Sequence, residues 1–289
     1  MEKEERPSLR ERLEDENKII VLPGVFDALS ARIAEQVGFD AMFQTGYGSS
    51  AVLLGMPDFG FLNAGETVDN AKRIIKAVSV PVLVDADTGY GNPLNAWRLV
   101  RDLESLGAAG IFLEDQIWPK RCGHMMGKEV VGKDEYIPKL KAAIEARKSK
   151  DFIIVARTDA RAPMGLDEAI ERGRAYKKAG ADVVFVEAPR SIEELKRIAN
   201  EIDAPLVANM IEDGVTPNLP AQELLRIGYR IAVFPLSALY SATFAMREVL
   251  TELKKTGATK ETKKMMVTFS DFNQFVDLQR YMDIEKRYS

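Results

Sequence analysis

The sequence predicts an α/β fold, a closed (β/α)8 barrel of the TIM type. Two observations in its 289 residues support this prediction: eight short apolar runs alternate with longer segments of helical periodicity, and no linker of distinct composition interrupts the alternation. We therefore predict a single barrel domain over residues 1–289. An open, doubly wound sheet is the alternative arrangement of the same elements.

The predicted strands are short runs rich in apolar residues. They span residues 19–22, 41–44, 80–84, 110–113, 152–156, 182–186, 205–208 and 231–234. Apolar residues recur at helical spacing in residues 28–38, 95–107, 166–180 and 191–202. Gly38, Gly107 and Gly180 lie at the ends of three of these segments, where glycine commonly stops a helix. The remaining residues 237–289 exceed one barrel helix, and we expect them to pack on a neighbouring subunit.

Composition excludes several classes of protein. Hydrophobic residues make up 46% and charged residues 29% of the chain, and no apolar run reaches the roughly 18 residues that span a bilayer. The first 18 residues lack the apolar core of a signal peptide, and a single cysteine cannot form an internal disulfide, so we expect a cytoplasmic protein. The net charge of -4 includes no basic cluster, which favours a small-molecule ligand over nucleic acid or membrane.

Polar residues directly follow five of the predicted strands. They are Asp85, Asp87, Glu114, Arg157, Glu187 and Asn209. The carboxyl ends of barrel strands share one rim, where such barrels build their sites. Strand alternation predicts that Asp85 and Asp87 point to the same side, and oxygen ligands without Cys or His favour Mg²⁺ or Mn²⁺. For any one of these acids, a helix N-cap or a salt bridge is the alternative role.

The only cysteine and the only histidine of the chain lie three positions apart in the segment PKRCGH, residues 119–124. Two cations, Lys120 and Arg121, precede Cys122, and His124 follows it. Such neighbours lower a thiol pKa from about 8.5, so we interpret Cys122 as a proton donor on a mobile, cationic loop. A zinc site and a buried structural thiol are the alternatives.

These residues resemble the isocitrate lyase and phosphoenolpyruvate mutase superfamily, and within it the short lyases typified by 2-methylisocitrate lyase. The resemblance covers residues 21–257 and rests on PGVFDALSARIAE, TGYGSSAVLLGMPDFG, VDADTGYGN, FLEDQ followed by PKRCGH, ARTDA and VANMIEDGVTP. The pairing of VDADTGYG with KRCGH is highly specific. The resemblance implies a barrel whose eighth helix is exchanged between subunits, in a homotetramer made of two such pairs.

The resemblance also implies roles for individual residues. Magnesium would be held by Asp85 and Asp87, with support through bound waters from Asp58 and Glu114. The keto-acid part of the substrate would be bound by Arg157 and Glu187, and its carboxylate by Thr45 and Gly46. Cys122 would be the catalytic acid. The departing acid would be contacted by Arg121, Gly123, His124 and Asn209.

Three departures from the family pattern bear on the substrate. Phe43 stands at the end of the second strand, where the lyases usually carry a tyrosine considered as the base, and Tyr47 is the candidate to replace it. Tyr240 stands where methylisocitrate lyases have an arginine that would suit an additional carboxylate. The segment GYGNPLN, residues 89–95, is closer to dimethylmalate lyase, oxaloacetate hydrolase and carboxyphosphonoenolpyruvate mutase.

The sequence thus predicts a magnesium-dependent carbon-carbon lyase acting on a 2-hydroxy di- or tricarboxylate. The first choice of substrate is 2-methylisocitrate, cleaved to pyruvate and succinate in propionate metabolism. The alternatives are a 2,3-dimethylmalate lyase or oxaloacetate hydrolase, a carboxyphosphonoenolpyruvate phosphonomutase, and a barrel that binds ligands without catalysis.

Overall fold

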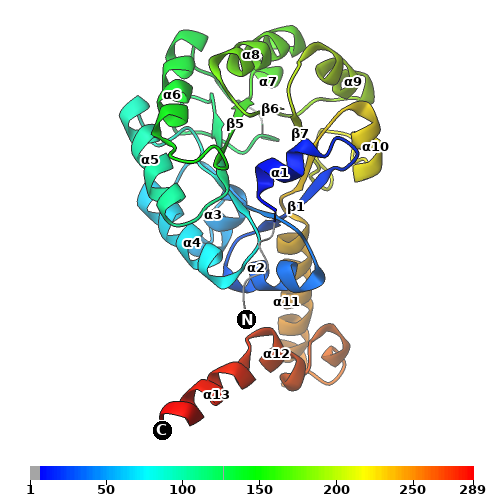
Figure 1. The fold of residues 1–289 in the computed structure, drawn as a ribbon. Coiled ribbons are helices and arrows are strands. Elements are labelled where there is room, and N and C mark those ends of the chain that lie inside the picture. The colour runs from blue at the N-terminus through cyan, green and yellow to red at the C-terminus, as the bar shows by residue number, and fades with distance from the viewer. Residues whose placement is uncertain (1–6, 126) are drawn as a thin grey trace. The chain divides into compact units, whose positions relative to one another are not determined.

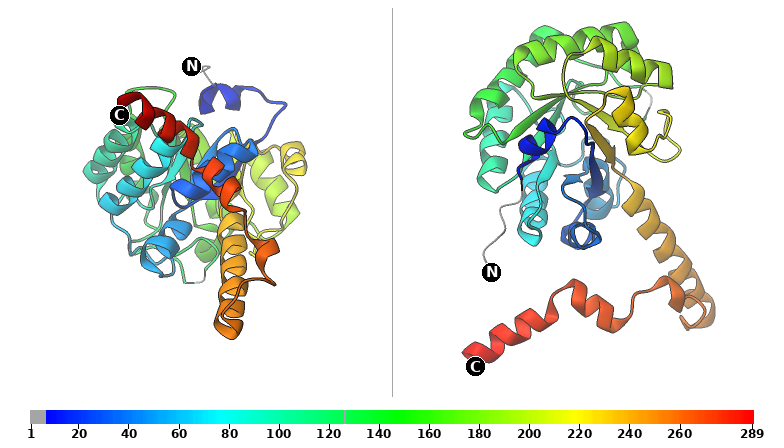
Figure 2. Two further views of the ribbon diagram at one scale, coloured as in Figure 1. Left: turned by 90° about the horizontal axis from the view of Figure 1, so that it is seen from below. Right: turned by 45° about the vertical axis from the view of Figure 1, so that its right-hand side comes forward.

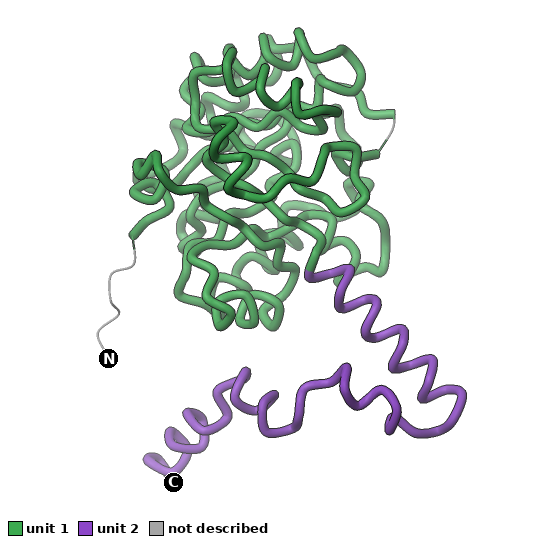
Figure 3. Tube along the Cα trace, turned by 90° about the vertical axis from the view of Figure 1, so that its right-hand side faces the viewer, with its two compact units in different colours: residues 1–237 green, residues 238–289 purple. Residues whose placement is uncertain are grey.

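A computed structural model of the protein describes residues 7–125 and 127–289. The chain forms two compact units, Met1–Ser237 and Ala238–Ser289 (Figure 3). The first unit is a closed barrel in which each strand pairs with the next in chain order and β8 pairs with β1 (Figure 1). All of these pairings are parallel, which confirms the predicted barrel and excludes the open sheet.

The eight predicted strands are all present, and their bounds differ from the predicted ones by a few residues. They are β1 (Ile20–Val25), β2 (Met42–Gln44), β3 (Val82–Asp85), β4 (Gly110–Glu114), β5 (Ile153–Thr158), β6 (Val183–Val186), β7 (Leu206–Asn209) and β8 (Ile231–Phe234). The helices of this unit lie around the strands (Figures 1 and 2). They are α1 (Leu9–Glu14), α2 (Ala28–Val37), α3 (Gly46–Leu54), α4 (Ala64–Ala77), α5 (Pro93–Ser105), α6 (Lys133–Ala146), α7 (Arg161–Met164), α8 (Leu166–Ala179), α9 (Ile192–Glu201) and α10 (Ala221–Ile227).

The predicted glycine stops are confirmed. Gly38 and Gly180 cap α2 and α8 with φ angles of 102° and 111°, a left-handed conformation that glycine adopts without steric cost. Gly107, with φ of 91°, follows the end of α5. Each glycine turns the chain from a helix into the next strand.

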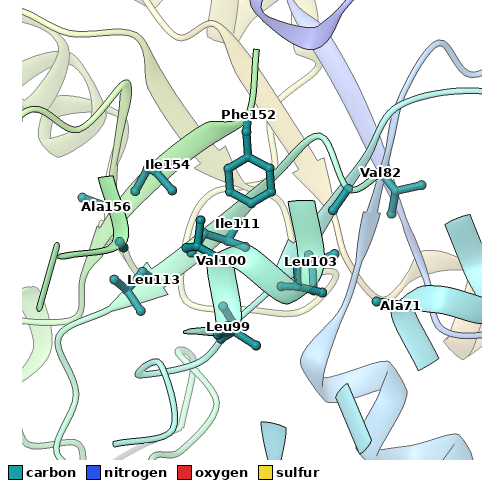
Figure 4. Packing of buried hydrophobic residues seen from close by; sticks show 14 of the residues in the cluster. Ala71, Val82, Leu99, Val100, Leu103, Ile111, Leu113, Phe152, Ile154 and Ala156 are labelled. Atoms are coloured by element: carbon teal, nitrogen blue, oxygen red, sulfur yellow. The ribbon is translucent and has the colours of Figure 1, made fainter. Parts of the chain in front are cut away.

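Side chains along each strand alternate between two apolar layers. One set, which includes Val82, Ile111 and Ile154, packs with Leu99 and Leu103 of α5 between the strands and the helices (Figure 4). The other set fills the inside of the barrel. It includes Leu22, Phe43, Leu83, Phe112, Val155, Phe185, Val207 and Val233. The inner layer continues to the carboxyl ends of the strands, where the predicted site residues lie.

Residues two positions beyond an inward-facing core residue point the same way, because strand side chains have a period of two. Leu83 is followed in this register by Asp85, and Phe112 by Glu114. The same step leads from Phe43 to Thr45, from Val155 to Arg157, from Phe185 to Glu187 and from Val207 to Asn209. At the carboxyl ends of these strands, the side chains inside the barrel thus change from apolar to polar or charged over a step of two residues.

Asp87 is an exception to the predicted geometry. The sequence predicts that strand alternation directs Asp85 and Asp87 to one side, but β3 ends at Asp85 and Asp87 lies in a turn with φ of +47°. The backbone N–H of Asp87 donates to Asp85 Oδ1 at 3.2 Å. The two carboxylates therefore come together through a turn, not through the strand.

The second unit consists of helices. They are most of α11 (Ser237–Thr256), the 3₁₀ turn η1 (Lys263–Met265), α12 (Phe269–Phe275) and α13 (Leu278–Tyr288). Large apolar side chains are exposed along it, among them Phe244, Leu250 and Phe269. In the part of the chain that the structure describes, no helix is both long and apolar enough to cross a membrane.

Candidate active site

A pocket lies at the carboxyl ends of the barrel strands and gathers most of the predicted site residues. Those that line it are Thr45, Tyr47, Asp58, Asp85, Cys122, Gly123, Arg157, Glu187 and Asn209. Its apolar lining includes Phe43, Phe112 and Phe185, with ring centroids 4.7 and 5.9 Å apart around Phe112. Residues from seven of the eight strands, β2 to β8, and from the segment after β4 thus meet at one site.

Four carboxylates and one ammonium form the first charged group beside the pocket, which we name the acid cluster. Its members are Asp58, Asp85, Asp87, Glu114 and Lys120. Lys120 Nζ lies 2.6 Å from Asp58 Oδ2 and 2.7 Å from Asp87 Oδ1, and the side chain is 2% exposed. The second oxygen of Asp87 accepts a hydrogen bond from the Tyr90 hydroxyl at 2.8 Å.

The acid cluster has too little positive charge for its carboxylates. Burial first, and then the charge of Asp87, raise the pKa of Asp85 to about 6. Burial also raises the pKa of Asp58 and of Glu114. Glu114 Oε1 is buried and has no hydrogen-bond partner among the described residues. The donor set therefore fits a cation that binds carboxylate oxygen.

Gly46 keeps the space beside Asp85 open. Its N–H donates to Asp85 Oδ2 at 3.2 Å at the start of α3. A Cβ at Gly46 would lie 2.7 Å from the same oxygen and 3.5 Å from Asp87 Oδ1. Thr45 precedes it as the N-cap of α3, and its hydroxyl accepts from the N–H of Gly48 at 3.3 Å. Any side chain at Gly46 would fill the approach to both carboxylates.

The acid cluster is not a finished metal cage. Across residues 7–125 and 127–289, no three or more His, Cys, Asp or Glu side chains converge in an arrangement that could hold a metal ion. The four predicted metal carboxylates therefore lie around Lys120 and are not assembled as direct ligands of one point.

A second charged group, the arginine cluster, lies across the pocket. It comprises His124, Lys128, Arg157, Asp159 and Glu187. Arg157 binds Asp159 in a bidentate pair, with Nε to Oδ2 at 2.8 Å and Nη2 to Oδ1 at 3.1 Å. Its guanidinium also lies 3.4 Å from Glu187 Oε2 and 3.2 Å from Glu114 Oε2, so Arg157 connects the two clusters.

Cations and carboxylates balance in the arginine cluster. Burial alone would raise the pKa of Glu187, but Arg157 and His124 lower it to about 2. Burial likewise opposes ionisation of Asp159, and Arg157 with Lys128 nevertheless hold its pKa well below the ordinary value. Both carboxylates are therefore ionised at neutral pH.

The geometry around His124 fixes its tautomer. Nδ1 accepts a hydrogen bond from the N–H of Val215 at 3.1 Å, and Nε2 lies 3.1 Å from Glu187 Oε1. Because Nδ1 accepts a hydrogen bond, a ring proton is carried by Nε2, which faces Glu187. Asn209 Nδ2 donates to Glu187 Oε2 at 3.2 Å. Glu187 thus contacts two of the four residues that were predicted to contact the departing acid.

The environment of Cys122 differs from the predicted one. The sequence predicts a thiol pKa lowered by adjacent cations, but burial, opposed by a backbone hydrogen bond at His124 and reinforced by Asp58, raises the pKa of Cys122 to about 11. Lys120 is paired with carboxylates, and Arg121 lies 5.8 Å above the ring of Phe59. The thiol is therefore protonated at neutral pH, which suits a proton donor.

Comparisons with known proteins agree with this geometry. Residues 9–254 match the family described as phosphoenolpyruvate phosphomutase. The chain belongs to that family. It is 48% identical to 2,3-dimethylmalate lyase of Eubacterium barkeri, over 94% of each chain. It is 41% identical to 2-methylisocitrate lyase of Aeropyrum pernix, over 98% of this chain and 90% of that one.

Solved structures of the phosphoenolpyruvate mutase and isocitrate lyase superfamily share the fold. Oxaloacetate acetylhydrolase bound to 3,3-difluorooxalacetate gives a TM-score of 0.92 at 37% identity, covering 97% of this chain and 96% of that one. Phosphonopyruvate hydrolase in complex with oxalate and Mg²⁺ gives 0.87 at 28% identity, covering 97% of each chain. The predicted superfamily is thereby confirmed, and the two relatives from Eubacterium barkeri and Aeropyrum pernix are lyases by name.

Two of the predicted site residues, Arg121 and Tyr47, differ from what the sequence predicts. Arg121 is exposed and is not among the residues that line the pocket. Tyr47 lines the pocket, but burial, together with the charges of Cys122 and Asp58, raises the pKa of its phenol. Tyr47 is therefore protonated at neutral pH, which suits a hydrogen-bond donor, and its role as the base stays a prediction.

Sequence reasoning missed three residues of the charged clusters. Lys120 and Lys128 belong to a segment interpreted as mobile, yet both side chains are buried. Asp159 is part of the motif ARTDA but was not among the predicted site residues. A signal for Asp159 exists, because it follows Arg157 by two residues on the inward face. For Lys120 and Lys128, the only signal in the sequence is the excess of acidic residues at the rim, which calls for buried cations to pair with them.

Proposed function

We propose that this family member is a magnesium-dependent carbon-carbon lyase that cleaves the bond between C2 and C3 of a 2-hydroxy di- or tricarboxylate. One observation carries the proposal: the protonated thiol of Cys122 lines the same pocket as a carboxylate group that lacks positive charge. Cleavage of this bond needs a cation at the C2 oxygen and a proton for C3. The pocket offers a place for each.

The acid cluster would hold the metal. Mg²⁺ usually binds proteins through one or two carboxylates and keeps several waters, so it does not need a preformed cage. Asp85 is the best direct ligand, because Lys120 and Tyr90 already engage Asp87. Glu114, with its unpartnered oxygen, would act through water. Bound there, Mg²⁺ or Mn²⁺ would supply positive charge to the oxygen on C2.

Side chains of the pocket would transfer the protons, bind the substrate and exclude water. The C2 hydroxyl would give its proton to a carboxylate of the pocket, such as Asp58, as C2 becomes a carbonyl. The C2–C3 electron pair would move to C3, where the Cys122 thiol would deliver a proton. Arg157 is held rigidly by Asp159 and would bind the keto acid, while Asn209 and His124 would face the departing acid. Apolar walls from Phe43 and its neighbours would exclude water.

The first substrate to test is 2,3-dimethylmalate. A relative with 48% identity carries that activity in its name, and Tyr240 replaces the cation expected for a third carboxylate. Cleavage of 2,3-dimethylmalate would yield pyruvate and propionate. The substrate predicted from the sequence, 2-methylisocitrate, is the second candidate, supported by the relative from Aeropyrum pernix. Its cleavage would yield pyruvate and succinate.

A product assay tests the proposal. The protein is incubated with 2,3-dimethylmalate, 2-methylisocitrate, isocitrate and oxaloacetate, before and after exhaustive chelation and after return of Mg²⁺ or Mn²⁺. We expect pyruvate from the first two, loss of turnover after chelation and recovery with metal. Full turnover with negligible metal content would refute the metal requirement. Turnover of carboxyphosphonoenolpyruvate alone would favour the phosphonomutase, and no turnover at all would favour the ligand-binding barrel.

We also propose that residues 237–289 pack on a neighbouring subunit in a homotetramer, as predicted from the family resemblance. Exposed apolar side chains along this segment, such as Phe244, Leu250 and Phe269, support the proposal, since exposed apolar stripes commonly mark interfaces. Light scattering would give the mass in solution. Truncation after residue 237 should yield a smaller species, and an unchanged tetramer would contradict this assignment.

A further inference from the structure

Lys128 lies on the segment after β4 and has a buried side chain that is 1% exposed. Its Nζ lies 2.9 Å from Asp159 Oδ1. The same ammonium donates a hydrogen bond to the backbone carbonyl of Gly123, the residue that follows Cys122. Lys128 therefore joins the thiol segment to the end of β5.

Asp159, the carboxylate that pairs with Lys128, is itself held in place by other contacts. The N–H of Asp159 donates to Asp115 Oδ1 at 2.9 Å, and Asp115 is completely buried. Asp159 also forms the bidentate pair with Arg157. Because Asp115 and Arg157 both hold Asp159, the Lys128 ammonium bound to it has a fixed position relative to the barrel strands.

Gly123 is pressed against the arginine cluster on its other side. A Cβ at Gly123 would lie 2.5 Å from Arg157 Nη2 and 2.6 Å from Glu187 Cδ. The segment therefore has no room to move inward, and its carbonyl is held by Lys128. Cys122 is also tied through its own N–H, which donates to the carbonyl of Asp58 at 3.2 Å. The thiol is located by contacts from two directions.

We propose that Lys128 is a positioning residue, which holds the carbonyl of Gly123 to Asp159 and thereby keeps the Cys122 thiol at the pocket. A lysine that served only the stability of the barrel would not need to bind the segment that carries the proton donor. The catalytic consequence rests on the proposed function. The tether itself does not, because it can be measured without substrate.

The sole cysteine of the chain reports on this tether. In Lys128→Met, which keeps the apolar stem and removes the ammonium, we expect alkylation of Cys122 by iodoacetamide at a fixed neutral pH to be at least ~10-fold faster than in the wild type. Such a ratio corresponds to about 1.4 kcal/mol in the opening equilibrium. Lys128→Arg keeps the charge and should restore most of the protection.

Lys139→Met is the matched control. Lys139 is also buried, but it donates to the backbone carbonyl of Thr88 at 3.0 Å, in the turn after β3 and outside the Cys122 segment. We expect it to affect thermal stability as Lys128→Met does, and to leave the alkylation rate within about twofold of the wild type. Equal acceleration in both variants would overturn the proposal, because it would reflect general loosening of the barrel.

Hydrogen exchange separates local from global opening. Faster exchange in Lys128→Met confined to peptides within residues 117–130 supports the tether, and uniform or unchanged exchange refutes it. This measurement also decides the matter if Lys128→Met is poorly stable. With an active preparation, kcat should fall at least ~10-fold while KM changes little, since positioning the acid affects the chemical step. Absence of lyase turnover in the wild type would refute the proposed function and leave the tether standing.

Discussion

The acid cluster and the arginine cluster lie at the same rim and are built from the same residue types, yet their charges are balanced differently. Four carboxylates face one ammonium in the acid cluster, and burial raises the pKa of Asp85 to about 6. Two carboxylates face Arg157 and Lys128 in the arginine cluster, where the pKa of Glu187 falls to about 2. Burial is similar in both, so the number of cations decides the direction.

This difference assigns the clusters to different tasks. A group of carboxylates with raised pKa values gains stability from an added cation, as a metal site requires. A balanced group needs no added ion and is rigid before the substrate arrives, which favours orientation of reacting groups. Arg157 contacts both clusters, so it would bind a substrate that lies between the metal and the proton donor.

The largest effect is expected from Asp85→Asn. Removal of the charge beside Gly46 should abolish Mn²⁺ binding measured by calorimetry or electron paramagnetic resonance, and should lower kcat/KM by a factor of about 10³ or more, or at least ~4 kcal/mol. Asp102→Asn is the matched surface control, because Asp102 forms only an exposed pair with Arg98 and should behave as the wild type. Unchanged metal affinity in Asp85→Asn would remove Asp85 from the metal site.

A slightly smaller loss is expected from Cys122→Ser. The serine hydroxyl is a much weaker acid than a thiol, and loss of a general acid typically costs 10²- to 10⁴-fold in rate. Metal binding should be unaffected, since the thiol belongs to the pocket and not to the acid cluster. Cleavage at near wild-type rate would show that another group protonates C3, and Tyr47, with its protonated phenol, would be the next to test.

Only some residues of the two clusters can be predicted from the strand pattern of the sequence. Asp85, Glu114, Arg157 and Glu187 were predicted because each directly follows a short apolar strand, and the carboxyl ends of barrel strands share one rim. Asp87 was predicted for the wrong reason, since a turn and not the strand directs it. The strand pattern thus predicts which residues reach the rim, but not the path of the chain beyond it.

The segment with Cys122 shows what strand periodicity cannot predict. Lys120 pairs with Asp58, 62 residues away, and Lys128 with Asp159, 31 residues away. No repeat links such positions, so the sequence predicts only that Lys120, together with Arg121, acts on the neighbouring thiol. Both lysines instead pair with carboxylates from distant parts of the chain, and burial, which the sequence does not show, is the main reason why the pKa of the Cys122 thiol rises.

Stability as a function of pH provides a third, smaller test of the comparison, with opposite signs at the two clusters. The folded pKa of Asp85, about 6, exceeds the ordinary aspartate value of 3.8, so the ionised carboxylate costs stability. Without metal, wild-type stability relative to Asp85→Asn should fall by up to ~3 kcal/mol as pH rises from about 4 to 6.

Glu187 should show the reverse dependence. Its folded pKa of about 2 lies below the ordinary glutamate value of 4.5, so its contribution to stability is present above about pH 4.5 and is lost as pH falls toward 2. Wild-type stability relative to Glu187→Gln should therefore decrease between about pH 5 and 3. Urea unfolding at a series of pH values measures both differences. Slopes of the same sign would mean that the two clusters do not differ in charge balance.

The smallest effect is the thermal stabilisation of the protein by Mg²⁺. A ligand that binds only the folded state at a concentration 100 times its Kd adds about 2.7 kcal/mol of stability, and for a chain of this size each kcal/mol raises Tm by roughly 2 to 4 °C. We expect such a rise in the wild type and in Glu187→Gln, which leaves the acid cluster intact, and none in Asp85→Asn. Ca²⁺ and Na⁺ at the same ionic strength separate specific binding from screening. If Glu187→Gln abolished the rise and Asp85→Asn retained it, the cation would belong to the arginine cluster, and the assignment of tasks to the two clusters would have to be exchanged.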